Sequence, residues 1–158
     1  MNDIVIVNAT LEDKEELANT FQHFKNKNAM LKRAECFIMH KNAILAKLGN
    51  KIIGKALWYV KGDPNEGVVE LDELYVFENF RKRGIGNTLI NATIASAKKY
   101  FESLRIKPRR IFLSTEEDNL NARRLYKKFG FECVANLGPL YSDENNELIY
   151  ILDLTNDI

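Results

Sequence analysis

One segment constrains the fold more than any other: Val68 to Asn87 reads as a strand, a basic loop with glycines, and the start of a helix. Its first half is rich in Val, Leu, Tyr and Phe, as expected of a buried strand. The loop Arg81–Gly86 follows, and then a long stretch with apolar periodicity begins. A helix N-terminus offers unpaired N–H groups and a positive dipole end, and glycine lets a ligand approach the main chain. The segment therefore predicts a phosphate or pyrophosphate site.

Two known kinds of phosphate loop are excluded by inspection. The chain has no G-x-x-x-x-G-K-[ST], so a P-loop nucleotide hydrolase is not expected. Asn87, Thr88 and Leu89 follow Gly86, so the dinucleotide fingerprint G-x-G-x-x-G is incomplete. Taken alone, the loop is equally well interpreted as an ordinary solvated turn.

A second pattern downstream changes that balance. Arg81, Gly84 and Gly86 match Q/R-x-x-G-x-G/A, and the chain from Asn119 to Phe131 matches N-x-x-A-x-x-L-Y-x-x-x-G-F at every fixed letter. In these two motifs the chain resembles the GNAT superfamily of acyl-CoA-dependent N-acetyltransferases. The resemblance implies acetyl-CoA as co-substrate and the GNAT fold.

The resemblance also implies roles for individual residues. Tyr126 matches the family tyrosine that donates a proton to the coenzyme A thiolate, although it also lies at a spacing typical of core packing. Asn119 matches the asparagine that binds the pantetheine arm, and it could equally be a helix cap. The residues expected to bind the coenzyme are Leu74, Tyr75, Val76, Arg81, Lys82, Arg83, Gly84, Ile85, Gly86, Asn87 and Asn119.

Acidic residues on the predicted strand are candidates for the general base. At pH 7 only about one alkylamine in a thousand is neutral, so a carboxylate near the site is useful. Glu70 and Asp72 share one face of the strand, and in GNAT enzymes that use a carboxylate on this strand it falls at one of these positions. The choice between the two, or a water chain, stays open, and both could instead pair with neighbouring cations. Glu73 is interpreted as structural.

Periodicity and turn residues predict an α+β chain with one mixed sheet flanked by helices on both faces. A first helix is expected from Thr10, with Leu11, Leu17, Phe21 and Phe24 on one face. Further helices are expected at about 29–39, 84–104 and 120–129, and strands at about 4–7, 43–48, 51–60, 68–77, 111–115, 131–135 and 148–154. The resemblance identifies this order of elements as that of a GNAT domain.

Composition limits the class of protein. With 158 residues, 46% of them hydrophobic, one domain over residues 1–158 is expected. A net charge of +1 gives no indication of nucleic-acid or membrane binding. No signal peptide or membrane span is evident, so a cytoplasmic protein is expected. Cys36 and Cys133 are interpreted as core residues, and no metal site is expected.

The leading hypothesis is an acetyltransferase, EC 2.3.1.-, that moves the acetyl group of acetyl-CoA to a primary amine by direct attack in a ternary complex. The acceptor could be a polyamine, an amino-sugar, an amino acid or a protein amine. The alternative is a non-catalytic coenzyme A-binding sensor or interaction module. Because dimers are common in the family, a homodimer is also an expectation.

Overall fold

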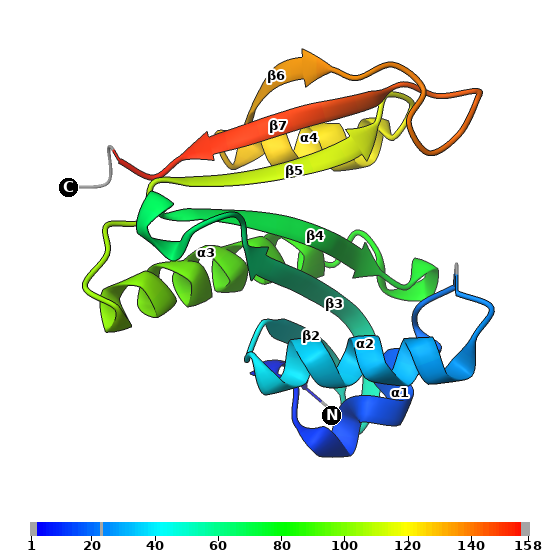
Figure 1. Ribbon diagram of the computed structural model, residues 1–158. Helices are drawn as coiled ribbons and strands as arrows, with labels where there is room; N and C mark the ends of the chain where they lie inside the picture. Colours follow the sequence, from blue (N-terminus) through cyan, green and yellow to red (C-terminus); the bar gives the residue numbers. More distant parts are fainter. Residues whose placement is uncertain (1–2, 23, 156–158) are drawn as a thin grey trace. The chain divides into compact units, whose positions relative to one another are not determined.

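Figure 1 shows a computed structural model of the chain, which describes residues 3–22 and 24–155. The helices are α1 (Lys14–Asn19), α2 (Lys27–Met39), α3 (Ile85–Ser103) and α4 (Leu120–Lys128). The strands are β1 (Ile4–Asn8), β2 (Ala43–Leu48), β3 (Lys51–Val60), β4 (Val68–Val76), β5 (Arg110–Glu116), β6 (Glu132–Asn136) and β7 (Glu147–Asp153). Every predicted strand is present, with ends within one residue of the prediction.

The strands of the described residues are hydrogen-bonded in the order β1-β2-β3-β4-β5-β7-β6. The pair β4–β5 is parallel, whereas β1–β2, β2–β3, β5–β7 and β6–β7 are antiparallel. The predicted α+β class with a mixed sheet is therefore confirmed. The chain divides into two compact units. Unit 1 comprises Met1–Trp58 and Glu73–Thr93, and unit 2 comprises Tyr59–Asp72 and Ile94–Ile158.

In unit 1, helices cover both faces of β3. The strand is paired with β2 through a hairpin in which Gly49 has a φ of 59°, and Leu48 lies opposite Lys51. A Cβ on Gly54 would lie 3.3 Å from side-chain atoms of Ile85 and Leu89, so α3 packs closely on one face. On the other face, Lys55 contacts the segment that follows α1. Figure 1 shows α1 and α2 packed side by side in this unit.

The first helix is shorter than predicted, which corrects the sequence-based interpretation. A 3-10 turn precedes α1, which ends at Asn19, so Phe21 and Phe24 lie beyond it. The cause is tertiary: the Lys55 ammonium donates to the Thr20 carbonyl at 3.3 Å and to its hydroxyl oxygen at 2.7 Å. The Thr20 hydroxyl in turn donates to the Leu17 carbonyl at 2.6 Å. These bonds replace those that would continue the helix, while Phe21 remains buried.

Lys55 is fully buried and also forms an ion pair with Glu73 at 2.7 Å, with its ammonium 4.2 Å from the Phe21 ring centroid. Glu73 is partly exposed, but Lys55 is not, so removing the carboxylate leaves a buried ammonium charge poorly compensated. We therefore expect Glu73→Gln to lower the free energy of unfolding by about 3 kcal/mol in urea titrations. As a control, Glu35→Gln removes the exposed Lys14–Glu35 pair and should cost less than about 1 kcal/mol. Equal losses in the two variants would contradict this assignment.

In unit 2, a tight turn sets the start of β4. The carbonyl of Gly67 accepts a bond from the Arg109 N–H at 2.7 Å, and β4 then runs parallel to β5 with Val68 opposite Arg110. Gly67 has a φ of 66°, and a Cβ there would lie 2.4 Å from the Lys107 carbonyl oxygen, so only glycine fits. Strand β7 lies between β5 and β6, and Figure 1 shows α4 beside these strands.

The interpretation of the cysteines was wrong. Cys36 and Cys133 are both exposed and free. Cys36 lies on α2, whose inward face is taken by Ala34, Phe37 and Ile38. Cys133 lies on β6, all of whose residues are exposed.

Candidate functional site

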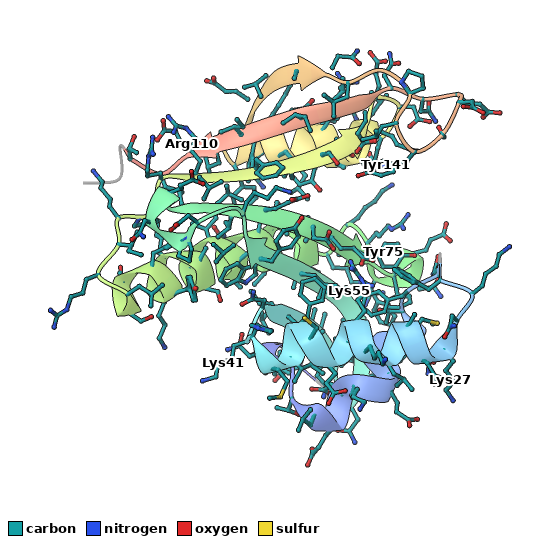
Figure 2. The ribbon with its side chains drawn as sticks, in the orientation of Figure 1. Lys27, Lys41, Lys55, Tyr75, Arg110 and Tyr141 are labelled. Carbon is teal, nitrogen blue, oxygen red and sulfur yellow. The ribbon has the colours of Figure 1, made fainter. Side chains whose placement is uncertain are left out.

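The residues predicted to bind coenzyme at the end of β4 lie in unit 1. Leu74, Tyr75 and Val76 end this strand. The Arg81 Nε donates to the Val76 carbonyl at 2.9 Å, and its guanidinium lies 5.6 Å from the Tyr75 ring centroid. Figure 2 labels Tyr75 in this strand. The Arg81 side chain therefore holds the loop against the strand end, a positional role that the sequence pattern did not reveal.

The loop from Lys82 to Asn87 has the backbone form of an anion site. Lys82 has a φ of 60° and Gly84 a φ of 78°. Both have a left-handed backbone, and Arg83 between them does not. Such alternation turns successive N–H groups toward one side. In the part of the chain that the structure describes, none of the N–H groups of residues 82–87 donates to a backbone acceptor. The first bond of α3 comes from the Thr88 N–H to the Gly84 carbonyl at 3.1 Å.

The loop is held by apolar and aromatic contacts while its charges face solvent. Ile85 is buried and anchors the first turn of α3, whereas Lys82, Arg83 and Gly84 are exposed. The Arg83 guanidinium donates to the Asn79 carbonyl at 3.3 Å and lies 5.4 Å from the Phe80 ring centroid. An array of unpaired N–H groups at a helix start, with adjacent cations, can bind a phosphate or pyrophosphate.

Tyr126 lies in unit 2, on the face of α4 that packs on β7. Its ring centroid is 5.8 Å from that of Phe131 and 6.1 Å from that of Tyr150. The side chain is buried, and burial raises the pKa of Tyr126 to about 12. Among the described residues its hydroxyl has no hydrogen-bond partner. A neutral buried hydroxyl of this kind can donate a proton to a bound molecule.

Asn119 caps the N-terminus of α4, which is one of the two roles predicted for it. Its side-chain carbonyl accepts a bond from the Ala122 N–H at 3.2 Å. That bond uses the oxygen only, so the amide NH₂ keeps its two donors for another acceptor. Both predicted roles are therefore compatible with this geometry.

The two candidate bases have different surroundings in unit 2. Glu70 Oε2 accepts a hydrogen bond from the Tyr59 hydroxyl and a second from the Lys61 ammonium at 3.2 Å. Asp72 is exposed. Burial raises the pKa of Tyr59, and its bond to Glu70 raises it further, so this phenol stays protonated. Sequence reasoning missed Tyr59 and Lys61, although the hairpin turn from β3 to β4 would have placed them opposite the start of β4.

Metal ligands and membrane-spanning helices were also sought among the described residues. No group of three or more His, Cys, Asp or Glu side chains there is arranged to hold a metal ion. Nor does any helix in this part of the chain combine the length and the apolar character that crossing a bilayer requires.

Comparison with known proteins gives a consistent result. The sequence model of the Acetyltransferase (GNAT) family matches residues 7–131. A spermine/spermidine N(1)-acetyltransferase of Bacillus subtilis (strain 168) is 32% identical over 92 residues, which cover 58% of this chain and 54% of that protein. The chain thus matches about half the length of this curated relative.

Solved structures with low identity share the fold. A Salmonella typhimurium protein, solved with its cofactor acetyl-CoA, has a TM-score of 0.77 at 17% identity, covering 96% of this chain and 94% of that one. Arabidopsis thaliana Naa50, in complex with the bisubstrate analogue CoA-Ac-MVNAL, has a TM-score of 0.73 at 18% identity, covering 94% and 97% of the two chains.

Proposed function

Because this chain belongs to the GNAT family of acetyltransferases, we propose that it is an enzyme that transfers the acetyl group of acetyl-CoA to a primary amine. The observation that carries the proposal is the family match over residues 7–131, which includes both motifs. The left-handed backbone at Lys82 and Gly84, with the N–H groups of the loop unpaired, supports pyrophosphate binding by residues 82–87. We extend the proposal to one domain over residues 1–158.

The chemistry follows from three requirements. The amine must lose a proton, its nitrogen must attack the thioester carbonyl carbon, and the departing thiolate must gain a proton when the C–S bond breaks. Tyr126 is proposed as the donor to the thiolate, since its hydroxyl is neutral and has no acceptor within the described residues. Asn119 is proposed to donate its amide NH₂ to the pantetheine arm, and Leu74, Tyr75 and Val76 to pair with it through the main chain.

Asp72 is the preferred general base of the two candidates. The Glu70 side chain is only 18% exposed, whereas Asp72 is exposed and so is reached more readily by an amine or a water. We expect Asp72→Asn to lower kcat about 100-fold at pH 7, and Glu70→Gln to affect mainly the KM of the amine. A pH series should recover part of the Asp72→Asn loss at high pH, where more amine is neutral. The reverse ranking of the two variants would assign the base to Glu70.

The acceptor is proposed to be a small polyamine, since the Bacillus subtilis relative is named for spermine and spermidine. The experiment is a measurement of coenzyme A release from acetyl-CoA over a panel of polyamines, aminoglycosides, amino acids and lysine peptides. Turnover confined to polyamines would support the proposal. Turnover confined to another class of amine would assign that class as the acceptor instead.

The alternative function is a coenzyme A-binding sensor without turnover. A sensor needs the loop 82–87 but not a neutral tyrosine with an unused hydroxyl, so Tyr126 favours the enzyme. Tight acetyl-CoA binding without release of coenzyme A on any amine would favour the sensor.

A further inference from the structure

In unit 2, the adjacent strands β3, β4 and β5 place a small group of side chains next to one another. The Lys61 N–H donates to the Val68 carbonyl at 2.9 Å, directly after the end of β3. The two strands are antiparallel, so Tyr59, two residues before Lys61, lies opposite Glu70, two residues after Val68. The β4–β5 register places Phe112 opposite Glu70 on the other side. These side chains therefore form one row across the sheet.

The row surrounds an ammonium group. Lys61 Nζ lies 3.2 Å from Glu70 Oε2, and it is 5.7 Å and 5.6 Å from the ring centroids of Tyr59 and Phe112. The Tyr59 hydroxyl donates to the same carboxylate oxygen and so orients it. We call Tyr59, Glu70 and Phe112 the ammonium cage. A carboxylate between two aromatic rings is an arrangement that suits an alkylammonium ion.

Lys61, whose ammonium lies in the cage, is more exposed to solvent than Glu70. The Lys61 side chain is 53% exposed, whereas that of Glu70 is 18% exposed. Lys61 follows the last residue of β3, so its side chain can swing out without disturbing a strand. A second alkylammonium ion of the same chemistry can then replace it, because the cage recognises only charge and an alkyl stem.

We propose that the ammonium cage binds an ammonium group of the acceptor, and that Lys61 occupies the cage until the acceptor displaces it. The inference rests on the proposed function and adds to it a binding site for a second nitrogen of the acceptor. The cage stabilises a charged ammonium, whereas the reacting amine must be neutral. The cage therefore suits the nitrogen that does not react, and the acceptor is a diamine or polyamine rather than a monoamine.

The test is calorimetric titration of 1,4-diaminobutane into the full chain and its variants. Lys61→Ala empties the cage and should tighten diamine binding about fivefold, the effect of removing one exposed competing ion pair with its ring contacts. Lys61→Arg keeps a competing cation and should bind as the wild type does. Adding Phe112→Leu to Lys61→Ala should reverse most of the gain. Lys14→Ala, which removes the exposed ion pair with Glu35, is the matched control and should change nothing.

Unchanged or weaker diamine binding in Lys61→Ala, or an equal gain in Lys14→Ala, would overturn the inference. Binding of n-butylamine as tight as that of the diamine would also overturn the choice of a diamine class. Because the titration requires no turnover, its outcome is separate from that of the proposed function. Tighter diamine binding in Lys61→Ala without coenzyme A release by any variant would support the cage and contradict the enzyme.

Discussion

Tyr126→Phe is expected to lower kcat by about 10²–10⁴-fold while the Kd for acetyl-CoA stays within about twofold, because only the proton donor is lost. The ring remains, so the contacts with Phe131 and Tyr150 persist. The measurement is steady-state coenzyme A release together with a binding titration of acetyl-CoA. A parallel loss of binding and rate would indicate that Tyr126 is structural.

Tyr150→Phe is the matched control for Tyr126→Phe. Tyr150 belongs to the same aromatic group and is fully buried, and its hydroxyl oxygen accepts a bond from Arg123 Nε at 3.1 Å. Removing that hydroxyl should lower the free energy of unfolding by about 1 kcal/mol and leave kcat within about twofold. A loss of kcat as large as that of Tyr126→Phe would show that the rate depends on packing rather than on the Tyr126 hydroxyl.

The pH dependence gives a second readout of Tyr126. Its pKa is raised to about 12 by burial, so the hydroxyl is neutral from acid pH to about pH 11. The basic limb of the kcat profile should therefore lie above pH 10. The raised pKa of Tyr126 also determines how the free energy of unfolding changes with pH. An exposed tyrosine in the unfolded chain ionises near pH 10. The contribution of Tyr126 to the free energy of unfolding is thus complete below pH 10 and is lost as pH rises toward 12.

Gly84→Val is expected to weaken acetyl-CoA binding at least about tenfold, because a β-branched residue is strained at a φ of 78° and the loop must change its backbone form. The added side chain meets nothing within 4 Å, so a clash within the described residues is not the cause. The measurement is the Kd for acetyl-CoA, with the KM for the amine as a second readout.

Gly138→Val is the control for Gly84→Val. Gly138 lies in the loop between β6 and β7, has a φ of 72°, and likewise has nothing within 4 Å of an added Cβ. The substitution imposes the same backbone strain in a segment that is not part of the loop 82–87, so the Kd for acetyl-CoA should stay unchanged. Equal weakening by both substitutions would attribute the effect to general destabilisation.

Local signals in the sequence predict most of the fold. The hairpin at Gly49, the cap at Asn119 and the left-handed Gly130 after α4 are all set by residues close in the chain. The end of α1 could not be predicted, because Lys55, distant in sequence, takes the Thr20 carbonyl. The exposure of Cys36 could not be predicted either, since the weak periodicity of α2 left its inward face uncertain.

The candidate site was predictable to a similar degree. The two motifs predict roles for the loop 82–87, Asn119 and Tyr126 from residues at fixed spacing, and these roles stay predictions. The partners of Glu70 were not predictable, since the bonds from Tyr59 and Lys61 depend on the register between β3 and β4. The positional role of Arg81 likewise depends on the turn that brings its side chain back to Val76.

The most direct test of the proposed function is to follow an isotope-labelled acetyl group from acetyl-CoA to spermidine by mass spectrometry, with the purified full chain. We expect labelled N-acetylspermidine to form in equal amount to the free coenzyme A, and Tyr126→Phe to slow both together. Binding of acetyl-CoA without any labelled amine, on spermidine or on the rest of the acceptor panel, would contradict the acetyltransferase assignment.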